Sequence, residues 1–539
     1  MGRDGNRGMG SQDRYLDVRL LGVSDLHGHL TGKGLAYTDP CTGIRAPAGG
    51  AGALAAEIGR RRAAAPDRTV LVHSGDMIGG GPPESTMLRD EPTIRVLNLM
   101  GFDVGTPGNH EFGNGIGELL RLVRGGAPPG GGELFEGQRF PMVSANIVDH
   151  VTRQPVFPPY AVKLIGGVPI AFTGATLTLT PLLITPGGTD GVEFLDEVES
   201  VNACVHELSR RGIKAIVLLL HEGGRQAAFP HGDVSPRVAD VVGALDHVDV
   251  VIAGHTHSVL NSTVNGRLVV QSSAFGKAFS DVRLVVDRDR RRVVTASASI
   301  VPVWRYSPPD AVGPRYEVPQ DPAVQAVVDA ARREVAPLTD QVVNTAARDL
   351  CAGRDDGATP AGESPLGNLI ADAQRWATGA QFAFVNPNGI RGKLGAGTIL
   401  WGDLFALQPA GNHLVTMHLT GAQIWELLGQ QARVRFKRNL EVSGLHYAYR
   451  STDSGAGVID SVHEGPPGDT SRPVRPDAAR VFTVTVNAFL AAGGDGYKAL
   501  TEGRRRVTGP HELDALVNYV SGLPSPVDYW IERRIVRYG

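Results

Sequence analysis

Side chains that can bind metal ions follow the ends of several short apolar segments in the first half of the chain. Five such segments are followed by Asp25 and His27, by Asp76, by Asn109 and His110, by His221, and by His255 and His257. These positions offer carboxylates, imidazoles and one amide but no thiolate, a donor set that suits two divalent ions such as Mn, Zn, Co, Fe or Mg. Asp76 lies between short glycine-flanked loops and is the candidate to bridge both ions.

The densest of these motifs is Gly-Asn-His-Glu-Phe-Gly at residues 108–113. Asn109 offers a neutral oxygen, and His110 offers a nitrogen that titrates near neutral pH. Taken alone, the motif predicts a turn more strongly than a site, because Gly and Asn are favoured in turns for backbone reasons. The polar residues at the other four segment ends make a site the better explanation. If there were no site, each of these segment ends would need its own structural reason for carrying such residues.

The segments that precede these residues are predicted strands, and they alternate with predicted helices. We expect strands at residues 19–23, 69–72, 141–144, 168–172, 214–220 and 248–253, and helices at 49–65, 93–100 and 192–211. This alternation predicts an α/β layered domain. In open α/β sheets ligands collect at the carboxyl ends of the strands, so the fold itself would bring the predicted ligands together.

Length and composition limit the number of domains and the kinds of partner that the chain is expected to have. The chain has 539 residues, too many for one compact core, and its net charge of −3 argues against a nucleic-acid polymer or an anionic membrane held by bulk charge. No apolar run is long enough to span a bilayer. The three cysteines Cys41, Cys204 and Cys351 do not suggest a disulfide framework. Nothing in the sequence predicts the oligomeric state.

The expected domain organisation follows from changes in composition along the chain. Residues 1–18 form a polar tail without the apolar stretch of a secretory signal, which predicts a cytoplasmic protein, or a secreted or periplasmic one if a leader precedes this sequence. Prolines between residues 307 and 322 predict a boundary, and an amphipathic helix follows at 323–336. We therefore expect a first domain at 19–306, a linker and bridging helix at 307–340, and a second domain at 341–539.

The second half carries polar motifs at the ends of its own predicted elements. The predicted strand that includes Phe384 and Val385 leads into a glycine loop at 386–391, a turn at 408–412 precedes the strand 414–417 and the helix 420–428, and the alternating strand 481–487 runs into Gly-Gly-Asp-Gly at 493–496. A further loop enters a helix near Ser364. Taken alone, Gly-Gly-Asp-Gly predicts only a tight turn with left-handed residues.

The first-half motifs, in their order, resemble those of the calcineurin-like metallophosphoesterases over residues 19–303. The resemblance implies a four-layer α/β/β/α domain that holds two divalent metal ions. One ion would take Asp25, His27, Asp76 and His257, and the other would take Asp76, Asn109, His221 and His255. His110 would lie beside the phosphate and stabilise the transition state.

The second half resembles the C-terminal domain of the 5′-nucleotidase family over residues 341–539, so the whole chain resembles a two-domain 5′-nucleotidase. The resemblance implies an α/β nucleotide-binding domain that delivers the phosphate to the metals. It assigns Phe489 to stacking on the base, Asp495 to the nucleoside and Arg391 to the phosphate. It also assigns Asn386, Gly389 and Asn412 to the base pocket. The expected catalytic residues are then His110, Asn109 and Arg391.

Four departures from the family pattern affect these expectations. Ala410 replaces a phenylalanine that forms half of the base sandwich, and Asn388 replaces a glycine of the phosphate loop. Residues 356–362 lack the arginines that the family often has there, and Gly113 replaces the usual aspartate partner of the catalytic histidine. Either the pocket accepts a modified nucleotide, or Phe436 or Tyr497 supplies the missing ring. His110 is expected to use another partner or to have a lower pKa.

Three functions fit these motifs. The first is a metal-dependent phosphomonoesterase that hydrolyses nucleoside 5′-phosphates, with a nucleotide as its small-molecule partner. The second is a 2′,3′-cyclic-nucleotide phosphodiesterase or a UDP-sugar hydrolase, which would share the same metal site. The third is a nucleotide-binding protein with little turnover. The complete set of predicted metal ligands favours the first two, because binding alone would not require all of them.

Overall fold

This computed structural model describes residues 14–230, 232–307, 317–352, 361–431, 439–451, 457–477 and 480–538. The described chain divides into two compact units. The first contains the described residues up to Thr180 together with Gly187–Arg333, and the second contains Pro181–Pro186 and the described residues from Glu334 onward. Both units mix helices and sheets, which confirms the predicted α/β class with two domains. None of the described helices combines the length and the apolar character needed to cross a membrane.

The first unit is built on two sheets. The first sheet has the order β15-β14-β1-β4-β5, in which β1, β4 and β5 are parallel and the other two strands run antiparallel to their neighbours. Its strands are β1 (Tyr15–Val23), β4 (Thr69–His73), β5 (Val104–Gly105), β14 (Ala278–Asp287) and β15 (Arg292–Pro302).

The second sheet has the order β12-β13-β11-β10-β8-β7, with a parallel centre and an antiparallel strand at each edge. Its strands are β7 (Tyr160–Ile165), β8 (Val168–Thr176), β10 (Ala215–His221), β11 (Val250–Ala253), β12 (Val259–Val264) and β13 (Arg267–Ser272). The parallel strands of both sheets include all those that carry the predicted metal ligands at their carboxyl ends.

The two sheets pack face to face through one apolar core. Leu20 and Val72 of the first sheet and Phe172 and Val217 of the second belong to the same buried cluster. β10 is buried along its whole length because it also has a helical layer behind it, which explains its uninterrupted apolar sequence.

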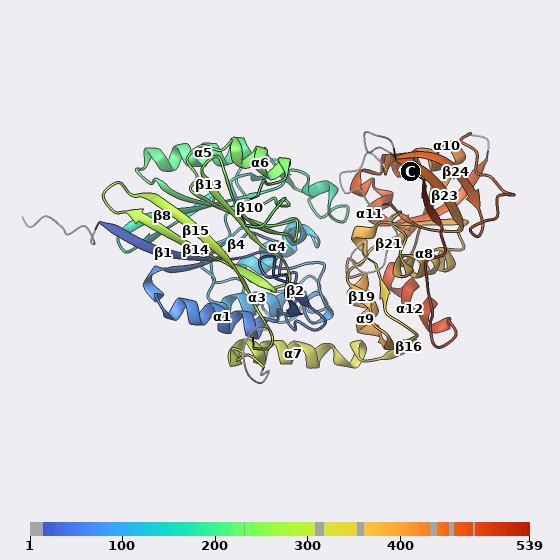
Figure 1. The fold of residues 1–539 in the computed structure, drawn as a ribbon, viewed down its shortest axis with the longest axis horizontal. Coiled ribbons are helices and arrows are strands. Elements are labelled where there is room, and N and C mark those ends of the chain that lie inside the picture. Colours follow the sequence, from blue (N-terminus) through green and yellow to red (C-terminus); the bar gives the residue numbers. More distant parts are fainter. Residues whose placement is uncertain are drawn as a thin grey trace, which may run out of the picture. The chain divides into compact units, whose positions relative to one another are not determined.

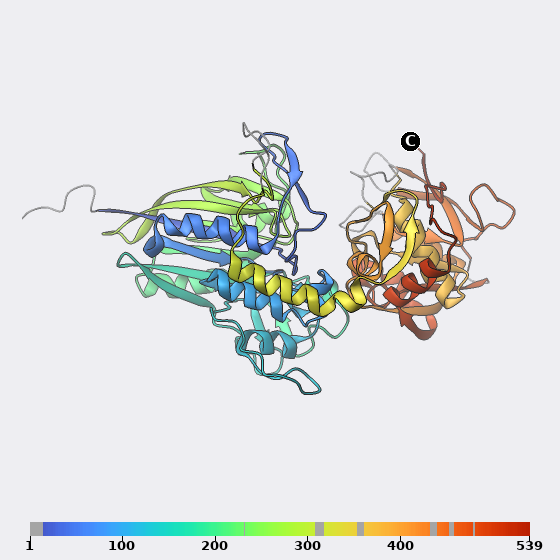
Figure 2. The ribbon, with the colours of Figure 1, turned by 90° about the horizontal axis from the view of Figure 1, so that it is seen from below.

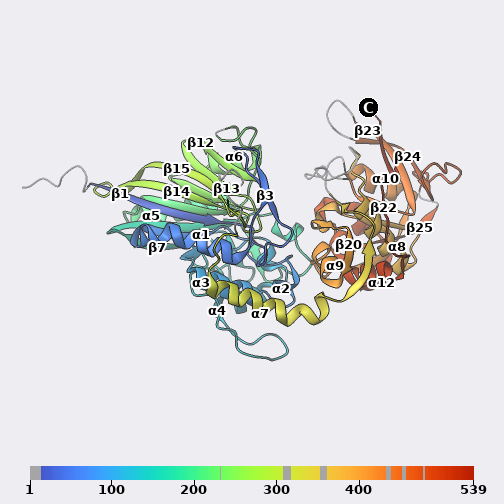
Figure 3. The same ribbon diagram turned by 60° about the horizontal axis from the view of Figure 1, so that its bottom comes forward.

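Helices cover both outer faces of this sandwich. One layer contains α5 (Glu197–Arg210) and α6 (Pro236–Gly243), and the opposite layer contains α1 (Ala51–Ala63), α3 (Glu91–Met100) and the start of α7 (Pro322–Thr339). Figure 2 shows α1 and the beginning of α7 on one face of the first unit, and Figure 3 shows α3 beside them. The predicted four-layer α/β/β/α arrangement is therefore confirmed.

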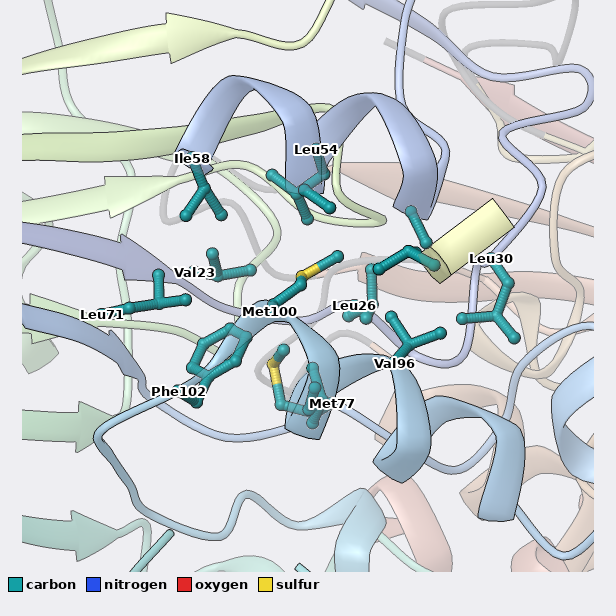
Figure 4. Close-up of a cluster of buried hydrophobic side chains, with 14 of the residues drawn as sticks. Val23, Leu26, Leu30, Leu54, Ile58, Leu71, Met77, Val96, Met100 and Phe102 are labelled. Atoms are coloured by element: carbon teal, nitrogen blue, oxygen red, sulfur yellow. The ribbon is translucent and has the colours of Figure 1, made fainter. Parts of the chain in front are cut away.

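The core beneath α1 and α3 also holds the loops that carry predicted metal ligands (Figure 4). Leu26 lies between Asp25 and His27 and is 0% exposed, and Met77 follows Asp76 and is 1% exposed. Both side chains point into the cluster that includes Leu54 of α1. These two ligand loops are therefore attached to the core by an apolar neighbour of the ligand.

Two predicted elements of the first unit are wrong in part. Residues 141–144 form only an isolated bridge, in which Gly105 N donates to Pro141 O and Val143 N donates to Gly105 O. Pro141 lacks an N–H, which limits this segment as a strand. In the predicted helix 192–211, Val192–Phe194 is instead the strand β9, which pairs with β6 (Ile147–Asp149), and α5 begins only after Asp196 caps its first turn.

The second unit has a five-stranded sheet in the order β22-β18-β25-β21-β26 and a three-stranded sheet in the order β24-β23-β27. Their strands are β18 (Phe382–Val385), β21 (His413–Thr420), β22 (Glu441–Ser443), β23 (Leu445–Ser451), β24 (Gly457–Glu464), β25 (Val481–Asn487), β26 (Arg504–His511) and β27 (Ile535–Tyr538). The helices α8 (Pro365–Thr378), α9 (Trp401–Leu407) and α12 (Glu512–Gly522) share one apolar cluster, and α10 (Gly421–Gln430) belongs to another.

Candidate functional site

Every predicted metal ligand of the first unit lies at or just after the carboxyl end of a parallel strand. β1 leads to Asp25 and His27, β4 to Asp76, β5 to Asn109, β10 ends at His221, and β11 leads to His255 and His257. The structure brings their donor atoms into groups in which all lie within 4.8 Å of one another. Two of these groups are Asp25, His27 and His257, and Asp76, His221 and His255.

The first group is centred on His27. Its Nε2 lies 3.0 Å from His257 Nε2 and 3.6 Å from Asp76 Oδ2, and Asp25 Oδ1 lies 3.8 Å from His257 Nε2. His27 Nδ1 lies 2.8 Å from the carbonyl oxygen of Gly79, which fixes the ring and leaves Nε2 directed toward the other donors. Two imidazole nitrogens at 3.0 Å with carboxylates beside them are the arrangement expected around a cation.

The second group is centred on Asn109 Oδ1. This oxygen lies 3.1 Å from His221 Nε2 and 3.1 Å from His255 Nδ1, while His221 Nε2 lies 3.2 Å from Asp76 Oδ2. The other nitrogen of His221 faces the carbonyl oxygen of Ser74 at 2.7 Å. Asp76 Oδ2 is thus near histidines of both groups, the position that a bridging carboxylate would need.

The backbone at these positions is strained. Five of the seven predicted ligands have left-handed backbone angles: Asp25 (φ 54), His27 (φ 48), Asp76 (φ 51), His255 (φ 74) and His257 (φ 54). Such values are uncommon for residues other than glycine, and they persist only where the surrounding structure imposes them. Strain concentrated at one cluster of polar side chains is typical of a functional site.

Two glycines allow the strand ends to approach each other. A methyl group on Gly75 would lie 2.5 Å from Gly108 N and 2.6 Å from His221 Nδ1. A methyl group on Gly108 would lie 2.3 Å from Asp76 Oδ1. The Gly-Asp and Gly-Asn pairs therefore need glycine because the backbones of two loops and one imidazole share the same space.

Glu111 joins the loops that carry Asp76 and Asn109, a role that the sequence analysis missed. Its carboxylate accepts hydrogen bonds from the backbone N–H groups of Asp76 at 2.9 Å, Met77 at 2.8 Å and Gly108 at 2.7 Å. Glu111 is 4% exposed. Its place in the motif was visible in the sequence, but its partners in the Asp76 loop are 34 and 35 positions away.

Burial and charge act on these groups together. Burial alone would raise the pKa of Asp76, but His221, His110 and His27 hold it well below its usual value. Burial would lower the pKa of His221, but the neighbouring carboxylates of Asp76 and Asp25 raise it to about 10. Burial raises the pKa of Asp25 to about 7. The site therefore favours positive charge beside Asp76.

His110 begins the short helix η2 (His110–Phe112) and is only partly buried. Its backbone N–H donates to Asp76 Oδ1 at 2.8 Å, and its ring meets that of His27 edge-on with centroids 4.7 Å apart. Gly113 closes the same turn. His255 and His257 are also partly buried, whereas His27 and His221 are at most 1% exposed, so the accessible side of the cluster is the one that contains His110.

In the second unit the structure brings Asn386 and Asp495 together. Asn386 follows β18, and its Nδ2 donates to Asp495 Oδ2 at 3.1 Å. Asp495 has a left-handed backbone (φ 54) in the Gly-Gly-Asp-Gly turn. Burial raises the pKa of Asp495, while hydrogen bonds from Asn386 and Asn388 oppose that shift. Asn388, one of the departures from the family pattern, therefore contacts the same carboxylate.

Asn412 belongs to the same buried network through two residues that the sequence analysis did not single out. Asn412 Nδ2 donates to Glu512 Oε1 at 3.1 Å, and Asn487 Nδ2 donates to Glu512 Oε2 at 3.4 Å and to Asn386 Oδ1 at 3.1 Å. Glu512 is 3% exposed. Asn487 ends a predicted strand and was visible in the sequence, whereas nothing local marks Glu512.

The remaining predicted substrate residues are Gly389, Arg391 and Phe489. Gly389 closes the turn η5 (Pro387–Gly389) after Asn386, Arg391 N donates to Leu407 O at 2.9 Å, and Phe489 is partly buried in α11 (Ala488–Ala491). Tyr497 is wrong as a substitute for the missing ring, because it is 2% exposed and packed in the apolar core. Phe436 and residues 356–360 lie outside the described residues.

Comparison with known proteins gives two family matches. A family model described as calcineurin-like phosphoesterase matches residues 18–259, and one described as the C-terminal domain of 5′-nucleotidases matches residues 342–502. The first match contains all the predicted metal ligands, and the second contains all the predicted nucleotide residues.

Individual relatives span most of this chain. It is 35% identical over 526 residues to Endonuclease YhcR of Bacillus subtilis (strain 168), which covers 97% of this chain but only 41% of that protein. It is 31% identical over 546 residues to Cell wall protein Lmo0130 of Listeria monocytogenes, covering 93% of this chain and 67% of the relative. The solved structure of a 5′-nucleotidase precursor from Thermus thermophilus is similar with a TM-score of 0.78 and 27% identity, covering 97% of this chain and 99% of the other.

Proposed function

The chain belongs to the two-domain 5′-nucleotidase family, in which a calcineurin-like phosphoesterase domain precedes a 5′-nucleotidase C-terminal domain, and from this we propose that it is a metal-dependent phosphomonoesterase. Its substrates would be nucleoside 5′-phosphates. The observation that carries this proposal is the pair of donor groups that meet at Asp76, with Asn109 completing the second group.

The donor atoms fit two divalent cations. They are imidazole nitrogens and carboxylate or amide oxygens, the ligands of Mn, Zn, Co, Fe or Mg. Asp25 Oδ2 is buried and has no hydrogen-bond partner among the described residues, which is costly for a carboxylate unless a cation balances it. We assign Asp25, His27, Asp76 and His257 to one ion and Asp76, Asn109, His221 and His255 to the other. Two ions in such a site polarise a phosphoryl group and make a bound water a better nucleophile.

The surrounding residues of this chain would bind and orient the phosphate. We place His110 beside the transferring phosphoryl group, where its partly buried ring can donate a hydrogen bond as negative charge develops. The hydrogen bond from its backbone N–H to Asp76 holds the start of η2 against the shared carboxylate. Arg391 would add a guanidinium for the phosphate, since its planar donors match two phosphate oxygens.

The second domain would hold the nucleoside and present its phosphate to the metals. We assign the base to the ring of Phe489, because a base stacks on an aromatic face. Asp495, Asn386, Gly389 and Asn412 would line the same pocket. Ala410 and Asn388 are both exposed, and they change the pocket from the family pattern, which supports a modified nucleotide as the preferred substrate.

A phosphodiesterase activity is the second candidate. The relative with 35% identity is named an endonuclease, so hydrolysis of a phosphodiester belongs among the activities to test. The 2′,3′-cyclic nucleotides and UDP-sugars are the small-molecule forms of that alternative. A nucleotide-binding protein with little turnover is the third alternative, and the paired donor groups argue against it.

A phosphate-release screen with added Mn²⁺ or Mg²⁺ tests the proposal. We expect release from AMP, UMP or a bulkier nucleoside 5′-phosphate, and we expect Asp76→Asn to reduce it by at least about a thousandfold, since a shared ligand of both ions is lost. Unchanged turnover in Asp76→Asn would refute the shared site. A strong preference for AMP would refute the modified-nucleotide assignment, and cleavage of phosphodiesters alone would favour the second candidate.

A further inference from the structure

Every backbone N–H group of residues 75–77, in the turn that carries Asp76, has an acceptor. Those of Asp76 and Met77 donate to the carboxylate of Glu111. That of Gly75 donates instead to His73 Nδ1 at 3.3 Å. His73 is the last residue of β4 and is 1% exposed. Its imidazole therefore supplies the one acceptor for this turn that Glu111 does not supply.

The neighbours of His73 hold its ring in one place. Phe102 and Phe140 meet the ring edge-on, each with centroids 5.6 Å away. On the other side, a methyl group on Gly105 of β5 would lie 1.9 Å from His73 Nε2, so only glycine leaves room for the ring there. The imidazole thus lies against β5, the strand that leads to Asn109.

The hydrogen bond from Gly75 also fixes the tautomer of His73. Because Nδ1 accepts, it carries no proton, and the proton of the ring is on Nε2. Among the described residues, His73 Nε2 and Gln138 Oε1 are both buried and neither has a hydrogen-bond partner.

His73 and Gln138 line the same small cavity beside α3. The centre of a water molecule has about 10 Å³ of free space in it, and the other lining side chains are apolar except for Glu111. A space of that size with a donor and an acceptor on its walls suits a single water molecule. Such a water would accept from His73 Nε2–H and donate to Gln138 Oε1.

We propose that His73 is a positioning residue of the metal site. Its Nδ1 and the Glu111 carboxylate together hold the turn in which Asp76 faces both donor groups, and one buried water shared with Gln138 satisfies its Nε2–H. This inference rests on the proposed function, because Asp76 is the carboxylate that the two groups of donors would share. His73 acts through the backbone of Gly75 and not as a ligand.

Two substitutions separate the halves of the imidazole. In His73→Asn, Oδ1 can take the place of Nδ1 and accept from Gly75. In His73→Gln, the amide reaches toward the place of Nε2, and Gly75 N–H is left without an acceptor. Both variants lose packing and should be less stable. We expect Mn²⁺ added to the metal-free full-length protein in a calorimeter to bind at least about tenfold more weakly in His73→Gln, and within about twofold of the wild type in His73→Asn.

Hydrogen exchange gives a readout that does not depend on metal or turnover. The amide of Gly75 should exchange faster in His73→Gln than in His73→Asn, whereas lost packing alone would affect the two variants equally. Ile170→Val removes one buried methyl group from β8 and is the control for lost stability. Equal metal affinities in the two His73 variants, or equal exchange at Gly75, would overturn the positioning role.

The remaining outcomes separate this inference from the proposed function. A crystal structure of the wild type without a water between His73 Nε2 and Gln138 Oε1 would overturn the water bridge. If the wild type binds no Mn²⁺, the proposed function fails, while exchange at Gly75 still decides whether His73 holds the turn. If the wild type binds Mn²⁺ and releases phosphate, but the two His73 variants bind Mn²⁺ equally, the positioning role alone fails.

Discussion

Replacing Glu111 with glutamine should loosen the proposed metal site without unfolding the protein. One oxygen of the carboxylate accepts the N–H groups of Asp76 and Gly108, and the other accepts that of Met77. Glutamine has a single amide oxygen, which can occupy only one of these two positions. In the better orientation it keeps the bonds to Asp76 and Gly108 and turns its NH₂ group toward Met77 N–H, so two donors face each other.

The expected free-energy cost of Glu111→Gln follows from the one backbone N–H group, that of Met77, that loses its acceptor. A buried N–H group that loses its acceptor costs about 1–3 kcal/mol. Because Met77 is anchored in the core and Asp76 precedes it, we expect most of this cost to appear as displacement of the Asp76 loop rather than as global unfolding. At about 1.4 kcal/mol for each tenfold change, the affinity for at least one metal ion should fall about 5- to 150-fold. That range agrees with the effect typical of residues that orient metal ligands.

Calorimetric titration of metal-free protein with Mn²⁺ would measure this change directly, and phosphate release at increasing Mn²⁺ would show whether excess metal restores activity. Glu199→Gln is a suitable control, because Glu199 is an exposed carboxylate of α5 far from these loops in sequence. We expect Glu111→Gln to need more Mn²⁺ for half-maximal activity and to reach a similar maximum. Metal affinity equal to that of the wild type, with a folded protein, would refute the role assigned to Glu111.

Three further predictions concern other parts of the chain. Gly75→Ala should abolish metal binding at the second donor group, since its methyl group would lie 2.5 Å from Gly108 N; retained stoichiometry in a Mn²⁺ titration would contradict this. Burial raises the pKa of Glu441 from 4.5 to about 8. The contribution of its neutral form to the free energy of unfolding is therefore complete below about pH 4.5 and is lost as the pH rises through about 8. The wild type should therefore lose several kcal/mol between about pH 5 and about pH 9 in urea unfolding, and Glu441→Gln should remove that part of the slope. Glu512→Gln should raise KM for nucleotides about tenfold with little change in kcat, and an unchanged KM would show that its network does not shape the pocket.

The clustering of the candidate metal ligands could be predicted from the sequence because these residues lie at or just after strand ends. Asp25, Asp76 and His221 each lie at or just after the end of a short apolar run that predicts a buried strand, and parallel strands bring their carboxyl ends to one edge. The clamp formed by Glu111 could not be predicted, because it depends on which loops become neighbours after folding.

Errors in the predicted elements have a similar cause. Residues 192–196 have polar and apolar side chains at spacings that continue the helical pattern of α5, yet Val192–Phe194 pairs with β6 because Ile147 and Phe194 meet across the two strands. Tertiary pairing overrides local preference there. Tyr497 shows that residue type alone is also insufficient. Its ring is suitable for base stacking, but the surrounding core buries it.

In the polar network of the second unit, the hydrogen bonds fix the orientation of each side-chain amide. Asn487 Oδ1 accepts the N–H of Leu490, so its Nδ2 must face the other way, toward Asn386 Oδ1 and Glu512. Asn386 then has only its own Nδ2 left for Asp495. Because each amide can satisfy its neighbours in one orientation only, a change at Glu512 alters which groups Asn386 and Asp495 present to a nucleoside. Under the proposed function, the specificity of the nucleoside pocket would therefore depend on residues that need not touch the nucleoside themselves.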